Sequence, residues 1–192
     1  ATIPNCVSYD PTFSYEVAVI IADGLRRMYA EQEDIFYYIT VMNENYQHPA
    51  LPEGREDEVR DGIVQGMYLF REGKAAEESA PRVQLFGSGT ILREVIAAAD
   101  LLEQDWNVAA DVWSVPSFTE LGREGMAAER WNMLHPSEEP RQSFVETQLA
   151  GRPDGPAVAA TDYIRAFAEQ IRPYVKRRYH VLGTDGFGRS DY

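Results

Sequence analysis

The glycine pair in Gly87-Ser88-Gly89-Thr90 is the strongest candidate for a ligand-binding turn in this sequence. The turn lies between an expected strand and an expected helix, where backbone N–H groups and the helix dipole favour an anion. Nucleotide-binding patterns are incomplete, because Leu92 occupies the last position of G-x-G-x-x-G and no Walker A lysine is present. Close packing of strand on helix is the more frequent reason for such glycines, so we assign no ligand to them.

Histidine and cysteine are too sparse for a metal site that a sequence can identify. Cys6 is the only cysteine, and the three histidines, His48, His135 and His180, are widely separated. The sequence contains no H-E-x-x-H or C-x-x-C spacing and no G-x-S-x-G motif. His135 could act as a general base, but a hydrogen-bonded structural role is more frequent. Nearby, Glu129 and Arg130 are expected to form an ion pair beside Trp131.

An acidic, glycine-rich turn occupies residues 185–191, where Asp185 and Asp191 could ligate a cation. The turn lacks the residue order of a calcium-binding loop. It follows an expected strand, and loops at the carboxyl ends of parallel strands line ligand crevices. Taken alone, these residues predict an α/β domain with no assignable catalytic, cofactor-binding or metal-binding side chain.

The first quarter of the chain predicts half of an α/β unit. Residues 14–30 have apolar side chains at helical spacing, and Ser14 can cap the start of this helix. Residues 34–42 are aromatic and β-branched, which is typical of a buried strand. Two prolines and a glycine in residues 43–54 predict a linker and a domain boundary. Residues 55–73 predict a helix, or a helix followed by a strand.

A second α/β unit follows with clearer signals. Strands are expected at residues 82–86 and 111–115, with an amphipathic helix between them, which is the βαβ pattern of a parallel sheet. Residues 117–135 predict a helix interrupted by Gly122 and Gly125. The later expected elements are a short helix at 144–149, a strand at 157–160, a helix at 163–172 capped by Asp162, and a strand at 179–182.

Charge and composition limit the partners. The 192 residues carry a formal net charge of −13, which argues against binding of nucleic acid or an anionic membrane. No apolar run has the length of a membrane span, and no signal peptide is visible. A single cysteine excludes a disulfide within the chain and favours a cytoplasmic setting.

Several long blocks of this sequence closely resemble the homodimeric pyruvate dehydrogenase E1 family. The resemblance covers nearly the whole chain, with gaps around residues 55–80 and 137–156. Among the blocks are Tyr15-Glu16-Val17-Ala18-Val19-Ile20, Asn43-Glu44-Asn45-Tyr46, Val83-Gln84-Leu85-Phe86-Gly87-Ser88-Gly89, Glu129-Arg130-Trp131-Asn132-Met133-Leu134-His135-Pro136 and Val181-Leu182-Gly183-Thr184-Asp185-Gly186-Phe187-Gly188.

The resemblance implies an α/β fold with a three-layer, mostly parallel sheet like that of the transketolase C-terminal domain, preceded by the end of a second α/β domain. Residues 1–45 would form the end of the pyrimidine-binding domain, and residues 81–192 would form a C-terminal domain truncated at its C-terminus. Residues 46–80 would be the linker and connecting segment between them. Neither end of the chain resembles a natural terminus, so we expect a fragment. The family's thiamine diphosphate, magnesium and catalytic residues precede Ala1, so we expect no catalytic, cofactor or metal residue here.

The implied function is that of a subunit that decarboxylates pyruvate with thiamine diphosphate and magnesium, and reductively acetylates the lipoyl group of the acetyltransferase E2. Implied partners are the remainder of the E1 subunit, a second E1 subunit and E2. The fragment itself would shape the cleft and the dimer surface and would be inactive alone. Two alternatives stay open: a non-catalytic interaction module that docks a partner protein, and a small-anion-binding domain that uses Gly87-Ser88-Gly89.

Overall fold

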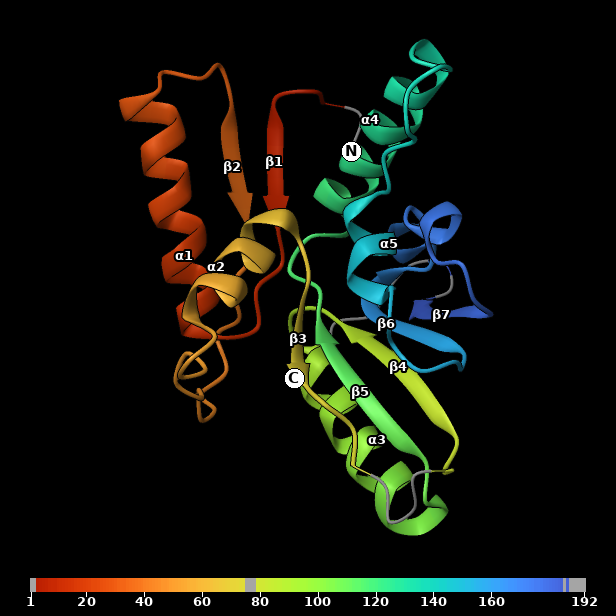
Figure 1. Cartoon of the computed structure of the whole chain (residues 1–192). Coiled ribbons are helices and arrows are strands. Elements are labelled where there is room, and N and C mark those ends of the chain that lie inside the picture. The colour runs from red at the N-terminus through yellow and green to blue at the C-terminus, as the bar shows by residue number, and fades with distance from the viewer. Residues whose placement is uncertain (1–2, 75–78, 185, 187–192) are drawn as a thin grey trace.

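The computed structural model describes residues 3–74, 79–184 and 186, which form two β-sheets surrounded by helices (Figure 1). One sheet has two strands and lies near the N-terminus. The other has five strands in the order β3-β5-β4-β6-β7. The described residues include no helix whose length and hydropathy would let it cross a bilayer.

The small sheet is a β-α-β unit. Strand β1 (Cys6–Tyr9) pairs in parallel with β2 (Phe36–Ile39), and helix α1 (Ser14–Leu25) connects them, ending in a π-helical turn at Arg26–Ala30. The expected helix at 14–30 is confirmed in extent, and the expected strand at 34–42 is shorter than predicted. Helix α2 (Glu56–Gln65) packs against α1. The sequence analysis did not predict β1.

The large sheet is parallel except at one edge. Its central strand, β4, pairs in parallel with β5 on one side and with β6 on the other. At one edge, β3 is antiparallel to β5. Leu85 lies opposite Val112 in the pairing of β4 with β5, which confirms one sheet for these two expected strands. The strands are β3 (Tyr68–Arg71), β4 (Arg82–Gly87), β5 (Ala109–Ser114), β6 (Ala157–Ile164) and β7 (Tyr179–Thr184).

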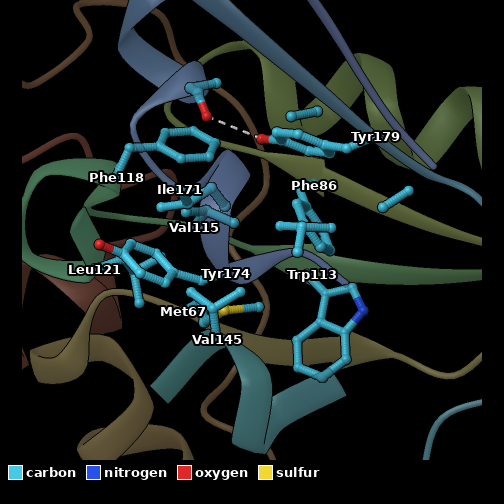
Figure 2. Packing of buried hydrophobic residues seen from close by; sticks show 14 of the residues in the cluster. Met67, Phe86, Trp113, Val115, Phe118, Leu121, Val145, Ile171, Tyr174 and Tyr179 are labelled. Carbon is cyan, nitrogen blue, oxygen red and sulfur yellow. Dashed lines mark hydrogen bonds between the residues drawn. The ribbon is translucent and has the colours of Figure 1, made fainter. Parts of the chain in front are cut away.

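Helices cover both faces of this sheet, as expected for a three-layer domain with a parallel sheet. Helix α3 (Ile91–Trp106) packs on one face, where Leu92 and Val95 meet Val83 and Leu85. The opposite face is covered by three helices, α4 (Phe118–Leu134), α5 (Phe144–Leu149) and α6 (Ala166–Glu169). Figure 2 shows the aromatic core on that side, which includes Phe86, Trp113, Phe118, Tyr174 and Tyr179.

The helix expected at residues 163–172 is confirmed only at Ala166–Glu169, and its expected start and cap are wrong. Strand β6 continues through Ile164, which pairs with Thr184 of β7, so Asp162 lies in a strand and caps no helix. Only the single turn of α6 and a 3₁₀ turn at Arg172–Tyr174 follow. Pro173 lacks an N–H group and cannot continue an α-helix. The short helix at 144–149 is confirmed.

Helix α4 is continuous, although we expected an interruption at its two glycines. Both glycines face neighbouring elements, and their missing side chains let those elements approach. A Cβ on Gly125 would lie 2.6 Å or less from three atoms of the buried Tyr174 ring, whereas a Cβ on Gly122 would lie 3.3 Å from Gln170 Cβ. The two positions therefore differ in how much space they offer.

This difference predicts opposite responses to alanine. Gly125→Ala should lower the free energy of unfolding by about 1–3 kcal/mol, because the rigid Tyr174 ring must move. Gly122→Ala is the matched control in the same helix, and should leave stability unchanged or raise it by up to about 1 kcal/mol through helix propensity. Urea unfolding of both variants measures this, and equal stabilities would contradict the packing argument.

Candidate functional site

The carboxyl ends of strands from both sheets meet in one place, which we call the strand-end junction: Asp10, Thr40, Ser88, Gly89 and Pro116. The Asp10 backbone N–H donates to the Pro116 carbonyl at 2.7 Å, and the Gly89 N–H donates to the Asp10 carbonyl at 3.0 Å. Chain segments that follow β1, β4 and β5 are thus tied together by main-chain hydrogen bonds. Ligands of α/β proteins usually bind at such strand ends.

A fully buried carboxylate, that of Glu16 in helix α1, joins this helix to the large sheet. Its Oε2 accepts hydrogen bonds from the backbone N–H groups of Thr12 (2.5 Å) and Phe13 (3.0 Å). Its Oε1 accepts from the Tyr68 hydroxyl (2.7 Å) and the Ser114 hydroxyl (2.6 Å). Burial raises the pKa of Glu16, and these four hydrogen bonds oppose that shift.

The N-terminus of α1 depends on acceptors from outside the usual capping position. We expected Ser14 to cap this helix, but Ser14 is its first residue and Phe13, which has no acceptor in its side chain, occupies the cap. The Glu16 carboxylate accepts hydrogen bonds from the N–H groups of Thr12 and Phe13, just before the helix. His48 Nδ1 accepts the third from Ser14 at 3.0 Å, so this histidine fastens the connecting segment to α1.

The glycine turn at residues 87–89 is a place of close approach. Gly89 has a φ of +50°, and a Cβ there would lie 2.5 Å from Asp10 Oδ2. A Cβ on Gly87 would lie 2.8 Å from Leu92 Cα, where β4 meets α3. A carboxyl group thus stands against the turn, and its negative charge disfavours an anion. These contacts favour the close-packing interpretation of both glycines.

The other two histidines lie apart from the junction and from each other. His135 stacks on Trp131 with ring centroids 4.4 Å apart, and its Nδ1 lies 2.8 Å from the Trp131 carbonyl. His180 Nε2 accepts a hydrogen bond from Arg178 at 2.8 Å. Across the described residues, no group of three or more histidine, cysteine or acidic side chains is placed to hold a metal.

Two further expectations have different outcomes. Within the described part of the chain no ion pair joins Glu129 to Arg130, because successive helical residues point in different directions. Arg141 instead packs over the Trp131 ring, 3.9 Å from its centroid. The acidic turn at residues 185–191 lies outside the described residues, apart from Gly186.

Two family models match this chain. The pyruvate dehydrogenase E1 component middle domain matches residues 1–49, and the transketolase-like C-terminal domain matches residues 66–192. The second match covers most of the chain, so the chain belongs to the family of transketolase-like C-terminal domains. Our own domain bounds of 1–45, 46–80 and 81–192 stay a prediction.

Comparison with curated relatives gives a more specific assignment than the domain family does. The chain is 66% identical over 191 residues to a pyruvate dehydrogenase E1 component of Cupriavidus necator, 62% identical over 192 residues to that of Pseudomonas aeruginosa, and 56% identical over 192 residues to that of Escherichia coli K12. These alignments cover 99–100% of the chain and 20–21% of each relative. The chain thus corresponds to the C-terminal region of a pyruvate dehydrogenase E1 component and spans about a fifth of such proteins.

The four-donor environment of Glu16 predicts a large effect of an isosteric change. In Glu16→Gln one carboxylate oxygen becomes an NH₂ group that faces donors, so the free energy of unfolding should fall by about 3 kcal/mol. Glu139→Gln, at an exposed position, should change it by less than about 0.5 kcal/mol. Urea denaturation of both variants is the measurement, and similar effects would show that the Glu16 contacts are energetically unimportant.

Proposed function

We propose that this chain is the C-terminal part of an E1 subunit that, when complete, decarboxylates pyruvate and reductively acetylates the lipoyl group of E2. The identity of 66% along the whole chain carries the proposal. Thiamine diphosphate with magnesium supplies the carbanion chemistry in that reaction. A cytoplasmic enzyme that acts as a homodimer is part of the same proposal.

The residues of this chain do not fit a magnesium diphosphate site. Within the described ranges, no three metal-ligating side chains converge, and the glycine turn at 87–89 faces the Asp10 carboxyl. We therefore propose that the remainder of the subunit holds the cofactor and that no catalytic step runs through this chain. Its contribution is to fix the end of the middle domain against the C-terminal domain.

The small sheet supports a role as part of a larger assembly. Phe36 and Thr40 donate their N–H groups to β1, so the backbone groups of Tyr37 and Ile39 between them turn toward the other edge of β2. No described strand pairs at that edge. Apolar side chains around it are exposed, with Tyr38 at 60% and Val41 at 71%. We propose that the rest of the E1 subunit covers this edge and that neighbouring surfaces meet the second subunit.

One observation favours the alternative of a docking module. Helix α4 exposes three large apolar side chains, those of Met126, Met133 and Leu134, away from the strand-end junction. Exposed apolar patches mark protein interfaces. Activity of the complete subunit separates the two functions, because a docking module would give a protein with no pyruvate-dependent turnover.

Cofactor binding tests whether the thiamine diphosphate site lies in the part of the subunit outside this chain. The complete subunit should bind thiamine diphosphate in the presence of magnesium and decarboxylate pyruvate, whereas residues 1–192 alone should give no saturable heat in calorimetry with cofactor and magnesium. The reason is the lack of a metal-ligating cluster in the described residues. A saturable, magnesium-dependent heat from the isolated chain would contradict the proposal.

Association tests the open edge. Unpaired strand edges and exposed apolar side chains promote self-association, so the isolated chain should increase in mean mass with concentration in light scattering. Val41→Lys, which places a charge beside the β2 edge at a side chain that is 71% exposed, should reduce this increase. Glu53→Lys, at an exposed position outside the sheets, is the matched control. A monomer at all concentrations would contradict the fragment interpretation.

A further inference from the structure

A cavity of about 260 Å³ lies at the strand-end junction, between the two sheets. Its walls come from distant parts of the chain: the ends of β1 and β2, the first turn of α4, the end of β6, and α6. The residues that matter here are Asp10, Tyr38, Thr40, Thr119, Tyr163 and Phe167. A cavity at the carboxyl ends of strands from two sheets has the usual position of a small-molecule site.

Among the described residues that line this cavity, Asp10 is the only one with a carboxyl group and none is basic. Asp10 Oδ1 accepts a hydrogen bond from the Thr40 hydroxyl at 2.6 Å. Burial raises the pKa of the Asp10 carboxyl, and the hydrogen bond from the Thr40 hydroxyl opposes that shift. Within the described residues Asp10 has no ion-pair partner. When it is ionised, Asp10 gives the cavity a negative potential, which disfavours anions.

Aromatic rings form much of the remaining wall. The rings of Tyr163 and Phe167 lie with centroids 4.8 Å apart, and Tyr38 lines the cavity from the small sheet. The faces of such rings attract cations, most strongly where water is excluded. A partly buried carboxylate without an ion-pair partner carries a desolvation cost, and a cation beside it offsets this cost.

We propose that this cavity binds an organic ammonium group, with Asp10 as its counter-ion and the rings of Tyr38 and Tyr163 as its walls. Thr40 holds the Asp10 carboxylate in position by its hydrogen bond. The ammonium group belongs either to a free small amine or to a lysine side chain from the part of the subunit outside this chain. Binding of the ammonium group is measured independently of pyruvate turnover, so its failure and the failure of the proposed function can be told apart.

The test uses the complete subunit and n-butylammonium chloride as the probe, with calorimetry at constant ionic strength. Saturable binding is expected, with butan-1-ol, the uncharged analogue, binding about tenfold or more weakly. Asp10→Asn should weaken butylammonium binding by about tenfold, and Tyr163→Leu should weaken it by about fivefold. Glu44→Gln is the matched control, because this exposed carboxylate pairs with Arg93 away from the cavity and should not change affinity.

A covalent readout distinguishes the two sources of the ammonium group. A water-soluble carbodiimide activates the Asp10 carboxyl, an amine nitrogen then forms an amide with it, and the carbodiimide leaves as its urea. Mass spectrometry should find an Asp10–lysine cross-link if a side chain occupies the cavity, in which case butylammonium competes with that cross-link, or the butylamide of Asp10 if the site takes free amines.

Folding of the variants is checked separately. Circular dichroism and urea midpoints of Asp10→Asn are compared with those of Thr40→Val, which keeps the carboxylate and removes only its hydroxyl donor, and should weaken butylammonium binding less than Asp10→Asn does. The proposal is overturned if no amide forms at Asp10 and, in addition, butylammonium and butan-1-ol bind equally or a folded Asp10→Asn variant binds butylammonium unchanged.

Discussion

The buried carboxylate of Glu16 is the constraint on which the rest of the structure depends. It accepts hydrogen bonds from the two residues before α1, from Tyr68 in β3 and from Ser114 in β5, so one side chain connects the helix of the small β-α-β unit to the large sheet. A buried ion adds little net stability, but loss of its partners is costly. The contacts of Glu16 therefore select one arrangement of the sheets. This is the reason that α1 can begin with Phe13 at its cap, where a polar residue is usual.

The two edges of the small sheet differ in whether other parts of the chain cover them. On the outer edge of β1, the Ser8 carbonyl accepts from the Ser117 hydroxyl and the Cys6 carbonyl accepts from Arg123, each at 2.7 Å. Side chains of α4 and of its cap thus close this edge. Further strands can join only at β2, on the far side from the large sheet. The hydrogen bonds of Glu16 and the covered edge of β1 together determine where a larger domain can extend.

Sequence patterns predicted those elements whose stability is local or whose apolar periodicity is long. The strands near residues 82–86 and 111–115 and the helix between them fall in this class. Strand β1 was missed because four residues between prolines carry little pattern, and its partner β2 is 30 residues away. The extension of β6 likewise depends on β7. Glu16 was missed as a key residue because one of its donors, Ser114, is 98 residues distant, although a lone acid in the apolar run Tyr15-Glu16-Val17-Ala18-Val19-Ile20 was an available signal.

Glu16, which is fully buried, and Asp10, which is partly buried, have different consequences because their surroundings differ. Glu16 has four donors for its two oxygens, so it is satisfied within the chain and has no need of a ligand. Asp10 accepts a hydrogen bond from the Thr40 hydroxyl, faces a cavity, and disfavours an anion at the glycine turn. The same carboxyl thus disfavours the anion that the turn at 87–89 led us to consider and favours a cation in the adjoining space. Spacing of glycines alone could not reveal this reversal, since the residue that causes it lies 79 positions before Gly89 in the chain.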